Sequence, residues 1–236
     1  EVVVIDAFTT DEDGHGTFHQ EFPGADISTF DVVLFVGTTA SGVIWSQPPD
    51  NAVIQFNSTT KTHLLPPGFT SLLADDFHFD GDQQIDRVRW WGGSCSLPAP
   101  ISTFRIRIHQ DDGTGKPGTV VFEQNNVDPD DTPTGATMDC SGAQFQFETD
   151  LSSPFIAQGG DTYFFAVAAV APDGETFFTW NGADATAPDA NGNSFTASGT
   201  SDMDPSSWSG TGIDQAFELV GTTDTLQLRA SGINPG

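Results

Sequence analysis

The stretch "TYFFAVAAVA" (residues 162–171) decides the fold class of this chain. It is apolar at nearly every position, whereas a strand with one face in water alternates apolar and polar residues. A short apolar run of this kind is typical of a central strand that is covered on both faces. We therefore expect residues 162–171 to lie in the middle of a sheet.

Further strand candidates lie on both sides of this stretch. Strand-sized apolar or alternating segments include "DVVLFVG" (31–37), "ADDFHF" (74–79), "QIDRVRWW" (84–91) and "GTVVFEQ" (118–124). "DGDQ" (80–83) is typical of a hairpin turn, and "QDDGTGKPG" (110–118) of a second tight connection. The polar run 181–212 is loop-like, with Phe195 and Trp208 as its expected anchors.

The composition agrees with a fold made only of strands. The chain has 25 Gly and 15 Pro among 236 residues, and it contains no long stretch with helical periodicity. We predict an all-β fold, a two-layer antiparallel β-sandwich that is jelly-roll-like, with a barrel as the alternative. Residues 43–236 are expected to form the sandwich. Residues 1–42, which begin with the apolar "EVVVIDAF", are expected to form an extension that packs on the sandwich or on a neighbouring subunit.

Most of the chain's few basic residues fall in two successive strand candidates. In "RVRWW" (87–91), alternation places Val88 and Trp90 on the core face, and "FRIRIH" (104–109) follows the same pattern. Because sequential strands usually pair, we expect one basic stripe on the outer faces of the two strands, edged by a Trp. The expected members of this stripe are Arg87, Arg89, Trp91, Arg105, Arg107 and His109.

Three interpretations of this stripe stay open. The Arg side chains can pair across the sheet with the chain's own carboxylates. They can bind an extracellular polysaccharide, with Trp91 stacked on a sugar ring. They can also dock the acidic face of a second copy of the chain, a contact that extends into a filament.

Charge narrows the range of partners. The chain has 33 acidic and 7 basic residues, and its formal net charge is −26. Such a charge argues against nucleic acid and against anionic membrane surfaces as partners. No apolar run is long enough for insertion into a membrane. Three interpretations of this acidic surface stay open: adaptation to high salt, the binding of divalent cations, or simply a soluble extracellular face.

Evidence in the sequence for a metal or for catalysis is slight. Asp111 and Asp112 in "QDDGTGKPG" are the candidate ligands of a structural Ca²⁺ ion, because paired carboxylates and Gly-rich backbone can present oxygen atoms together. A simple turn is the alternative. The five His are scattered, and no G-x-S-x-G motif is present. We expect a protein without enzymatic activity and with no other cofactor.

The cysteines point to an oxidising compartment. Cys95 and Cys140 are the only two, and both lie in polar, Gly- and Ser-rich segments. We expect a disulfide between them, worth about 4 kcal/mol in the chain-entropy model, with two buried thiols as the alternative. Secretion to the extracellular space or the cell surface follows from this expectation, and a chain that starts at Glu1 has the look of a processed form.

From residue 43 onward the chain resembles a group of secreted β-sandwich modules of bacterial surface proteins, including proteins with exosortase-type sorting tails. The matching segments are "IWSQPP" (44–49), "LADDFHF" (73–79), "IDRVRWWGG" (85–93), "FRIRIHQDDGTGKPGTVVFEQ" (104–124), "SSPFIAQGGDTYFFAVAA" (152–169), "FTWNG" (178–182) and "DQAFELVG" (214–221). The resemblance implies a jelly-roll-like extracellular module, usually without assigned catalysis, and it supplies no ligand.

Two functions are consistent with these features. The first is a secreted, non-enzymatic structural protein of the cell surface or extracellular matrix, which self-assembles into filaments. The second is a carbohydrate-binding module that recognises an extracellular polysaccharide through the basic stripe.

Overall fold

The computed structural model describes most of the chain from residue 31 onward. The described residues are 31–35, 40–50, 56–57, 59–61, 70–94, 103–138, 142–171, 178–187, 190–199, 208–223 and 227–231. The predicted strand "EVVVIDAF" and both cysteines lie outside these residues. No helix in the described part is long and apolar enough to cross a membrane.

All regular elements of the described part are strands. They are β1 Asp31–Phe35, β2 Ala40–Gln47, β3 Phe56–Asn57, β4 Thr59–Lys61, β5 Thr70–His78, β6 Gln83–Ser94, β7 Phe104–Asp111, β8 Pro117–Val127, β9 Asp130–Thr137, β10 Ala143–Ala157, β11 Thr162–Ala171, β12 Phe178–Trp180, β13 Phe195–Gly199, β14 Ser209–Gly210, β15 Phe217–Thr223 and β16 Gln227–Ser231. The predicted all-β class is confirmed.

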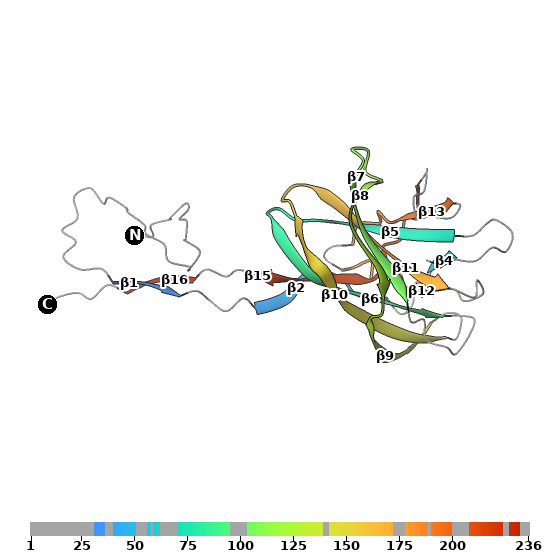
Figure 1. The fold of residues 1–236 in the computed structure, drawn as a ribbon, viewed down its shortest axis with the longest axis horizontal. Helices are drawn as coiled ribbons and strands as arrows, with labels where there is room; N and C mark the ends of the chain where they lie inside the picture. Colours follow the sequence, from blue (N-terminus) through green and yellow to red (C-terminus); the bar gives the residue numbers. More distant parts are fainter. Residues whose placement is uncertain are drawn as a thin grey trace. The chain divides into compact units, whose positions relative to one another are not determined.

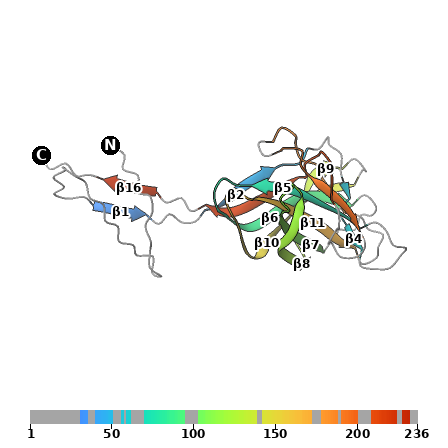
Figure 2. The ribbon, with the colours of Figure 1, turned by 90° about the horizontal axis from the view of Figure 1, so that it is seen from above.

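Two sheets pack face to face, and the predicted two-layer sandwich is confirmed (Figures 1 and 2). The first, which we call the β6 sheet, has the order β2-β15-β6-β10-β9, with β12 joining β6 to β3. The second, the β11 sheet, has the order β14-β13-β5-β4-β11-β7-β8. The described pairings are antiparallel except for β4 with β11, which run parallel.

Strand β11 has the double-sided burial that its sequence predicted. Tyr163, Phe165 and Val167 belong to the large core between the sheets. Phe164 and Ala166 belong to a smaller apolar cluster on the opposite face of the β11 sheet. The expected anchors of the 181–212 run, Phe195 and Trp208, pack against this smaller cluster, which confirms their role. The run is not wholly loop-like, however, because it contains the strands β13 and β14.

The turn at residues 80–83 is not the predicted hairpin. It joins β5 of the β11 sheet to β6 of the other sheet, and so it carries the chain across the sandwich. A second crossing turn, between β10 and β11, lies against it: Gly160 N donates to Phe79 O at 2.8 Å, and Gly159 N donates to Asp82 Oδ1 at 2.9 Å. These bonds satisfy backbone groups that a hairpin would have paired locally.

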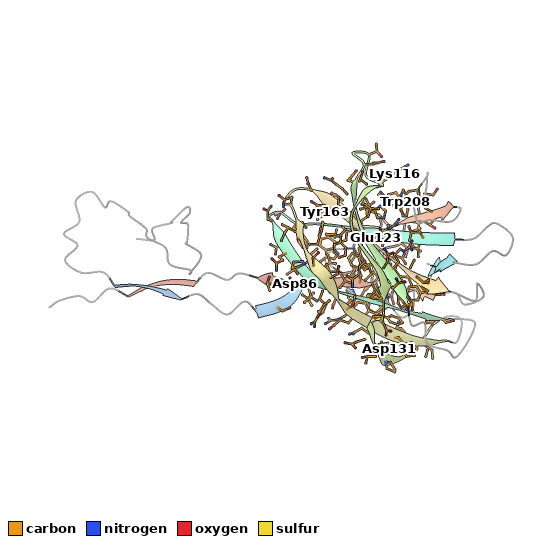
Figure 3. The ribbon with its side chains drawn as sticks, viewed as in Figure 1. Asp86, Lys116, Glu123, Asp131, Tyr163 and Trp208 are labelled. Atoms are coloured by element: carbon orange, nitrogen blue, oxygen red, sulfur yellow. The ribbon has the colours of Figure 1, made fainter. Side chains whose placement is uncertain are left out.

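The connection at residues 110–118 is a hairpin, as predicted, and it joins β7 to β8. Figure 3 shows Lys116 at the tip of this hairpin. Gly113 and Gly115 have φ angles of 87° and 80°, a region that favours glycine.

The chain divides into two compact units. Residues 38–225 form the sandwich unit, and residues 1–37 with 226–236 form a terminal unit. The sequence placed the boundary at residue 42 and assigned residues 226–236 to the sandwich. Within the terminal unit, β1 and β16 pair antiparallel from Asp31 opposite Ser231 to Phe35 opposite Gln227. Strands from the two ends of the chain therefore build one ribbon.

Candidate functional site

Arg87 and Arg89 lie on β6 among carboxylates of the two neighbouring strands. In the register, Arg89 stands opposite Glu148 of β10 and opposite Glu218 of β15. Its guanidinium makes ion pairs of 2.5 Å with both. Arg87 pairs with Glu148 at 2.9 Å and with Asp150 at 2.6 Å. Cross-strand acids thus neutralise both Arg side chains.

These contacts also affect the pKa of the two guanidinium groups. Burial lowers the pKa of Arg89, but hydrogen bonds to Glu148 and Glu218 outweigh it and raise the pKa above its usual value. The hydrogen bond to Asp150 is the main cause that raises the pKa of Arg87. Both side chains are therefore firmly charged and already bonded.

The two adjacent Trp of β6 are both covered. Trp90 has no exposed surface and stacks on Phe147 in the main core, as predicted. Trp91 lies outside that core cluster, in agreement with the alternation, but only 7% of its surface is exposed. The prediction that Trp91 presents an exposed ring beside Arg87 and Arg89 is therefore wrong. A ring this deeply covered offers little surface to a sugar.

Arg105, Arg107 and His109 lie on β7, on the face of the β11 sheet that points away from the main core. Glu123 of β8 accepts from Arg107 at 3.0 Å and lies 3.9 Å from Arg105. His109 is buried: its Nδ1 lies 3.0 Å from Gly118 O. The ring of Trp208, labelled in Figure 3, meets the His109 ring edge-on at 5.7 Å.

The predicted single basic stripe does not form. Strands β6 and β7 follow each other in the chain but lie in different sheets. Their outward faces therefore lie on opposite sides of the sandwich, because side chains that face out from two packed sheets point away from each other. The interpretation in which the Arg residues pair with the chain's own acids is the one that the structure confirms.

Asp111 and Asp112 shape the turn between β7 and β8. Asp111 Oδ1 accepts from the backbone of Gly113 at 2.6 Å, and Asp112 Oδ1 accepts from the backbone of Thr114 at 2.7 Å. The hydroxyl of Thr114 adds a bond that lowers the pKa of Asp112. In the part of the chain that the structure describes, no three or more His, Cys, Asp or Glu are grouped to hold a metal.

A buried acid cluster, formed by Asp75, Asp76 and Asp214, was missed by the sequence. Asp75 has no exposed surface, and Asp76 and Asp214 are each 6% exposed. Burial and the negative charge of Asp214 raise the pKa of Asp75 well above its usual value. Burial also raises the pKa of Asp76, against a hydrogen bond from Asn191 that lowers it. Two adjacent acids inside the apolar strand "LADDFHF" were the available signal.

The described residues around the cysteines lie close together. A Cβ added to Gly142 would lie 2.5 Å from the Ser94 carbonyl oxygen. Met138 N donates to Gly142 O at 2.8 Å. Cys95 directly follows Ser94 in the chain, and Cys140 lies between Met138 and Gly142.

One family model matches residues 43–220, about three quarters of the chain, and its description is "Domain of unknown function (DUF7901)". It covers the whole β6 strand, the β7–β8 hairpin and the buried acid cluster. No curated protein matches the chain.

Proposed function

For this chain, which belongs to the DUF7901 family of domains of unknown function, we propose a secreted, non-enzymatic structural role based on self-assembly. Copies of the chain associate through the terminal ribbon of β1 and β16. This is the first of the two functions that the sequence allows. The basic stripe that supported the second, polysaccharide binding, is not formed.

The observation that carries the proposal is the ribbon itself. Among the described strands, β1 pairs only with β16, so that each has one unpaired edge. The register sets Val32 opposite Ala230 and Leu34 opposite Leu228. Two-stranded ribbons are marginally stable in water, and they gain stability when further strands or an apolar layer join them. A second copy of the chain supplies such strands.

Three edge strands of the sandwich unit, β9, β8 and β14, are less suited to this role. All but one residue of β9 is exposed, and the strand contains Asp130, Asp131 and Pro133. Charges and Pro on an edge strand discourage pairing with another chain. Asn126, near the end of β8, has a φ angle of 55°, and the β7–β8 register shifts at several points. Strand β14 has only two residues.

Secretion and a Cys95–Cys140 disulfide belong to the same proposal. The closeness of Ser94 and Gly142, one and two residues from the cysteines, supports this bond, since a disulfide needs Cα atoms only about 4.4–6.8 Å apart. The proposal includes no Ca²⁺ at Asp111 and Asp112, where backbone and hydroxyl donors already bond one oxygen of each carboxylate.

The test compares the sedimentation of the full chain with that of Leu34→Lys, since Lys on an edge strand opposes strand addition. The matched control is Ile156→Lys, which adds the same charge at a position of β10 that is 46% exposed. We expect association in the wild type and in the control, and its loss in Leu34→Lys. A wild type that stays monomeric at all concentrations contradicts the proposal.

A further inference from the structure

We propose that the buried acid cluster holds a proton in the folded protein, and that loss of this proton as the pH rises loosens the sandwich. The proposal concerns the interior of the sandwich unit and is independent of self-assembly. In this proposal the cluster holds three segments of the chain together, and the strength of this connection depends on pH.

The cluster lies where β13 separates from β5. The two strands pair from Gly199 opposite Thr70 to Phe195 opposite Ala74, and beyond Ala74 β5 continues to His78 without β13. Asp75 and Asp76 are the first residues past this point. Asp75 shares its face with Leu73 and Phe77, which belong to the main core. Its carboxyl group therefore points between the two sheets.

Backbone N–H groups surround the cluster. Asp75 Oδ2 accepts from Gln215 N at 2.5 Å, and Asp75 Oδ1 accepts from Asp76 N at 3.0 Å. Asp214 accepts from three successive N–H groups, those of Asn191, Gly192 and Asn193, at 2.6, 2.9 and 2.9 Å. Such a run of N–H groups binds an anion. The cluster thereby ties β5 and the 191–193 loop to residues 214–215, which precede β15.

Asn191 bonds to two of the three acids, Asp76 and Asp214, and so connects them. Its side-chain Nδ2 donates to Asp76 Oδ2 at 3.0 Å, while its backbone N–H binds Asp214. The 191–193 loop is therefore held by acids from two different parts of the chain.

No strong positive charge balances the three acids. Within the described residues, no Lys or Arg forms an ion pair with Asp75, Asp76 or Asp214. The charged and titratable groups that face Asp75 are Asp214 and Asp76, and His78 acts on Asp76. A buried carboxylate without a cationic partner is relieved by taking up a proton.

The hydrogen bonds of the cluster show a shortage of donors. Asp76 Oδ1 and Gln215 Oε1 are buried, and no donor among the described residues bonds to either atom. Gln215 has no exposed surface, and its side-chain Nε2 already donates to Ile213 O at 2.9 Å. Buried acceptors without donors are rare in folded proteins. A carboxylic acid O–H in the cluster would supply one donor.

The sign of the pH effect follows from the direction of the pKa shifts. The pKa of Asp75 and that of Asp76 are raised in the folded protein, so the folded state binds protons more tightly than the unfolded chain. The resulting stability is fully present below the unfolded pKa of about 3.9, and it is lost as the pH rises through the folded pKa.

The test is the thermal midpoint of the full chain between about pH 5 and about pH 8 for the wild type, Asp75→Asn and Asp130→Asn. Asp75→Asn keeps the shape of the side chain and removes its titration. Asp130→Asn removes the same charge at an exposed position of β9 and controls for the general repulsion of an acidic chain. We expect the midpoint of the wild type and of the control to fall as the pH rises, and most of this shift to vanish in Asp75→Asn.

An unchanged pH shift in Asp75→Asn would overturn the proposal. If that variant does not fold, the wild type alone decides: carbon-13 NMR of the Asp carboxyl groups should show at least one that titrates well above the range of exposed Asp. Titration of all of them in the ordinary range, near pH 4, would overturn it too. The same scans with Ca²⁺ and with chelator test a cation in place of the proton. A midpoint that follows Ca²⁺ and not pH also contradicts the proposal.

Discussion

Arg89 Nη1 lies 2.5 Å from Glu218 Oε2, on the strand directly beside it. With Glu148 on its other side, Arg89 is the middle of a row of alternating charges across three strands. The positive charge of Arg89 is thus neutralised within the β6 sheet by the two strands beside it. This relationship favours a scaffold over a ligand-binding face at β6.

Removal of Glu148 should weaken the β6 sheet more than removal of Asp150. Glu148 is 24% exposed in its side chain and contacts both Arg87 and Arg89, whereas the Asp150 side chain is 72% exposed. We expect Glu148→Gln to lower the free energy of unfolding by about 1 kcal/mol and Asp150→Asn by less than about 0.5 kcal/mol, measured by urea unfolding. Equal losses would show that burial of the pair is irrelevant.

Trp91 should behave as a packing residue. With 7% of its surface exposed, Trp91→Ala should cost about 3–5 kcal/mol in unfolding free energy. Val43→Ala is the control, since Val43 is 48% exposed and should cost much less. A Trp91→Ala protein with unchanged thermal stability would contradict the burial and would reopen the role of this ring as a binding surface.

The disulfide proposal predicts a strong effect of reduction. Loss of a Cys95–Cys140 bond should cost about 4 kcal/mol and lower the thermal midpoint. Peptide mapping without reductant should recover the two cysteines in one linked pair, and Cys95→Ser should be as unstable as the reduced wild type. Alkylation of both thiols in the untreated, unfolded protein would disprove the bond.

Glu123 should give the opposite pH dependence to the buried acid cluster. Burial raises the pKa of Glu123, but the hydrogen bond from Arg107 outweighs it and the pKa is lowered. Its contribution to stability is present above the unfolded pKa of about 4.3, and it is lost as the pH falls through the folded value. Asp75 makes the protein less stable as the pH rises, and Glu123 makes it less stable as the pH falls. We therefore predict the greatest stability in mild acid, between these two pH ranges.

Thermal scans below about pH 5 test this predicted loss of stability on acidification. Glu123→Gln should reduce the loss of stability on acidification, whereas Asp130→Asn, at an exposed position of β9, should leave it in place. If stability falls as steeply on acidification in Glu123→Gln as in the wild type, the ion pair of Glu123 with Arg107 does not stabilise the fold.

The sequence predicted local features better than long-range ones. The burial of β11 on both faces, the β7–β8 hairpin and the anchoring by Phe195 and Trp208 all follow from residues near one another in the chain. Strand partners did not follow, because successive strands cross between the sheets at residues 80–83 and again before β7. Once β6 and β7 are separated, the predicted stripe is lost.

The buried acid cluster could not be read from the chain for a related reason. Asp75 and Asp214 are far apart in sequence, and the N–H groups that hold Asp214 come from a third segment, residues 191–193. The only indication of the cluster in the sequence was the adjacent acids Asp75 and Asp76 in an apolar strand. Trp91 is similar: alternation gave its face, but the layer that covers it depends on the tertiary structure.

The most direct test of self-assembly is the sedimentation velocity of the wild-type chain at low and high salt. The net charge of −26 repels copies over about 30 Å at 10 mM salt and over only about 3 Å at 1 M salt. We predict species larger than the monomer that increase with salt and with protein concentration. A single monomeric boundary at about 1 M salt, at every concentration, would contradict the proposed function.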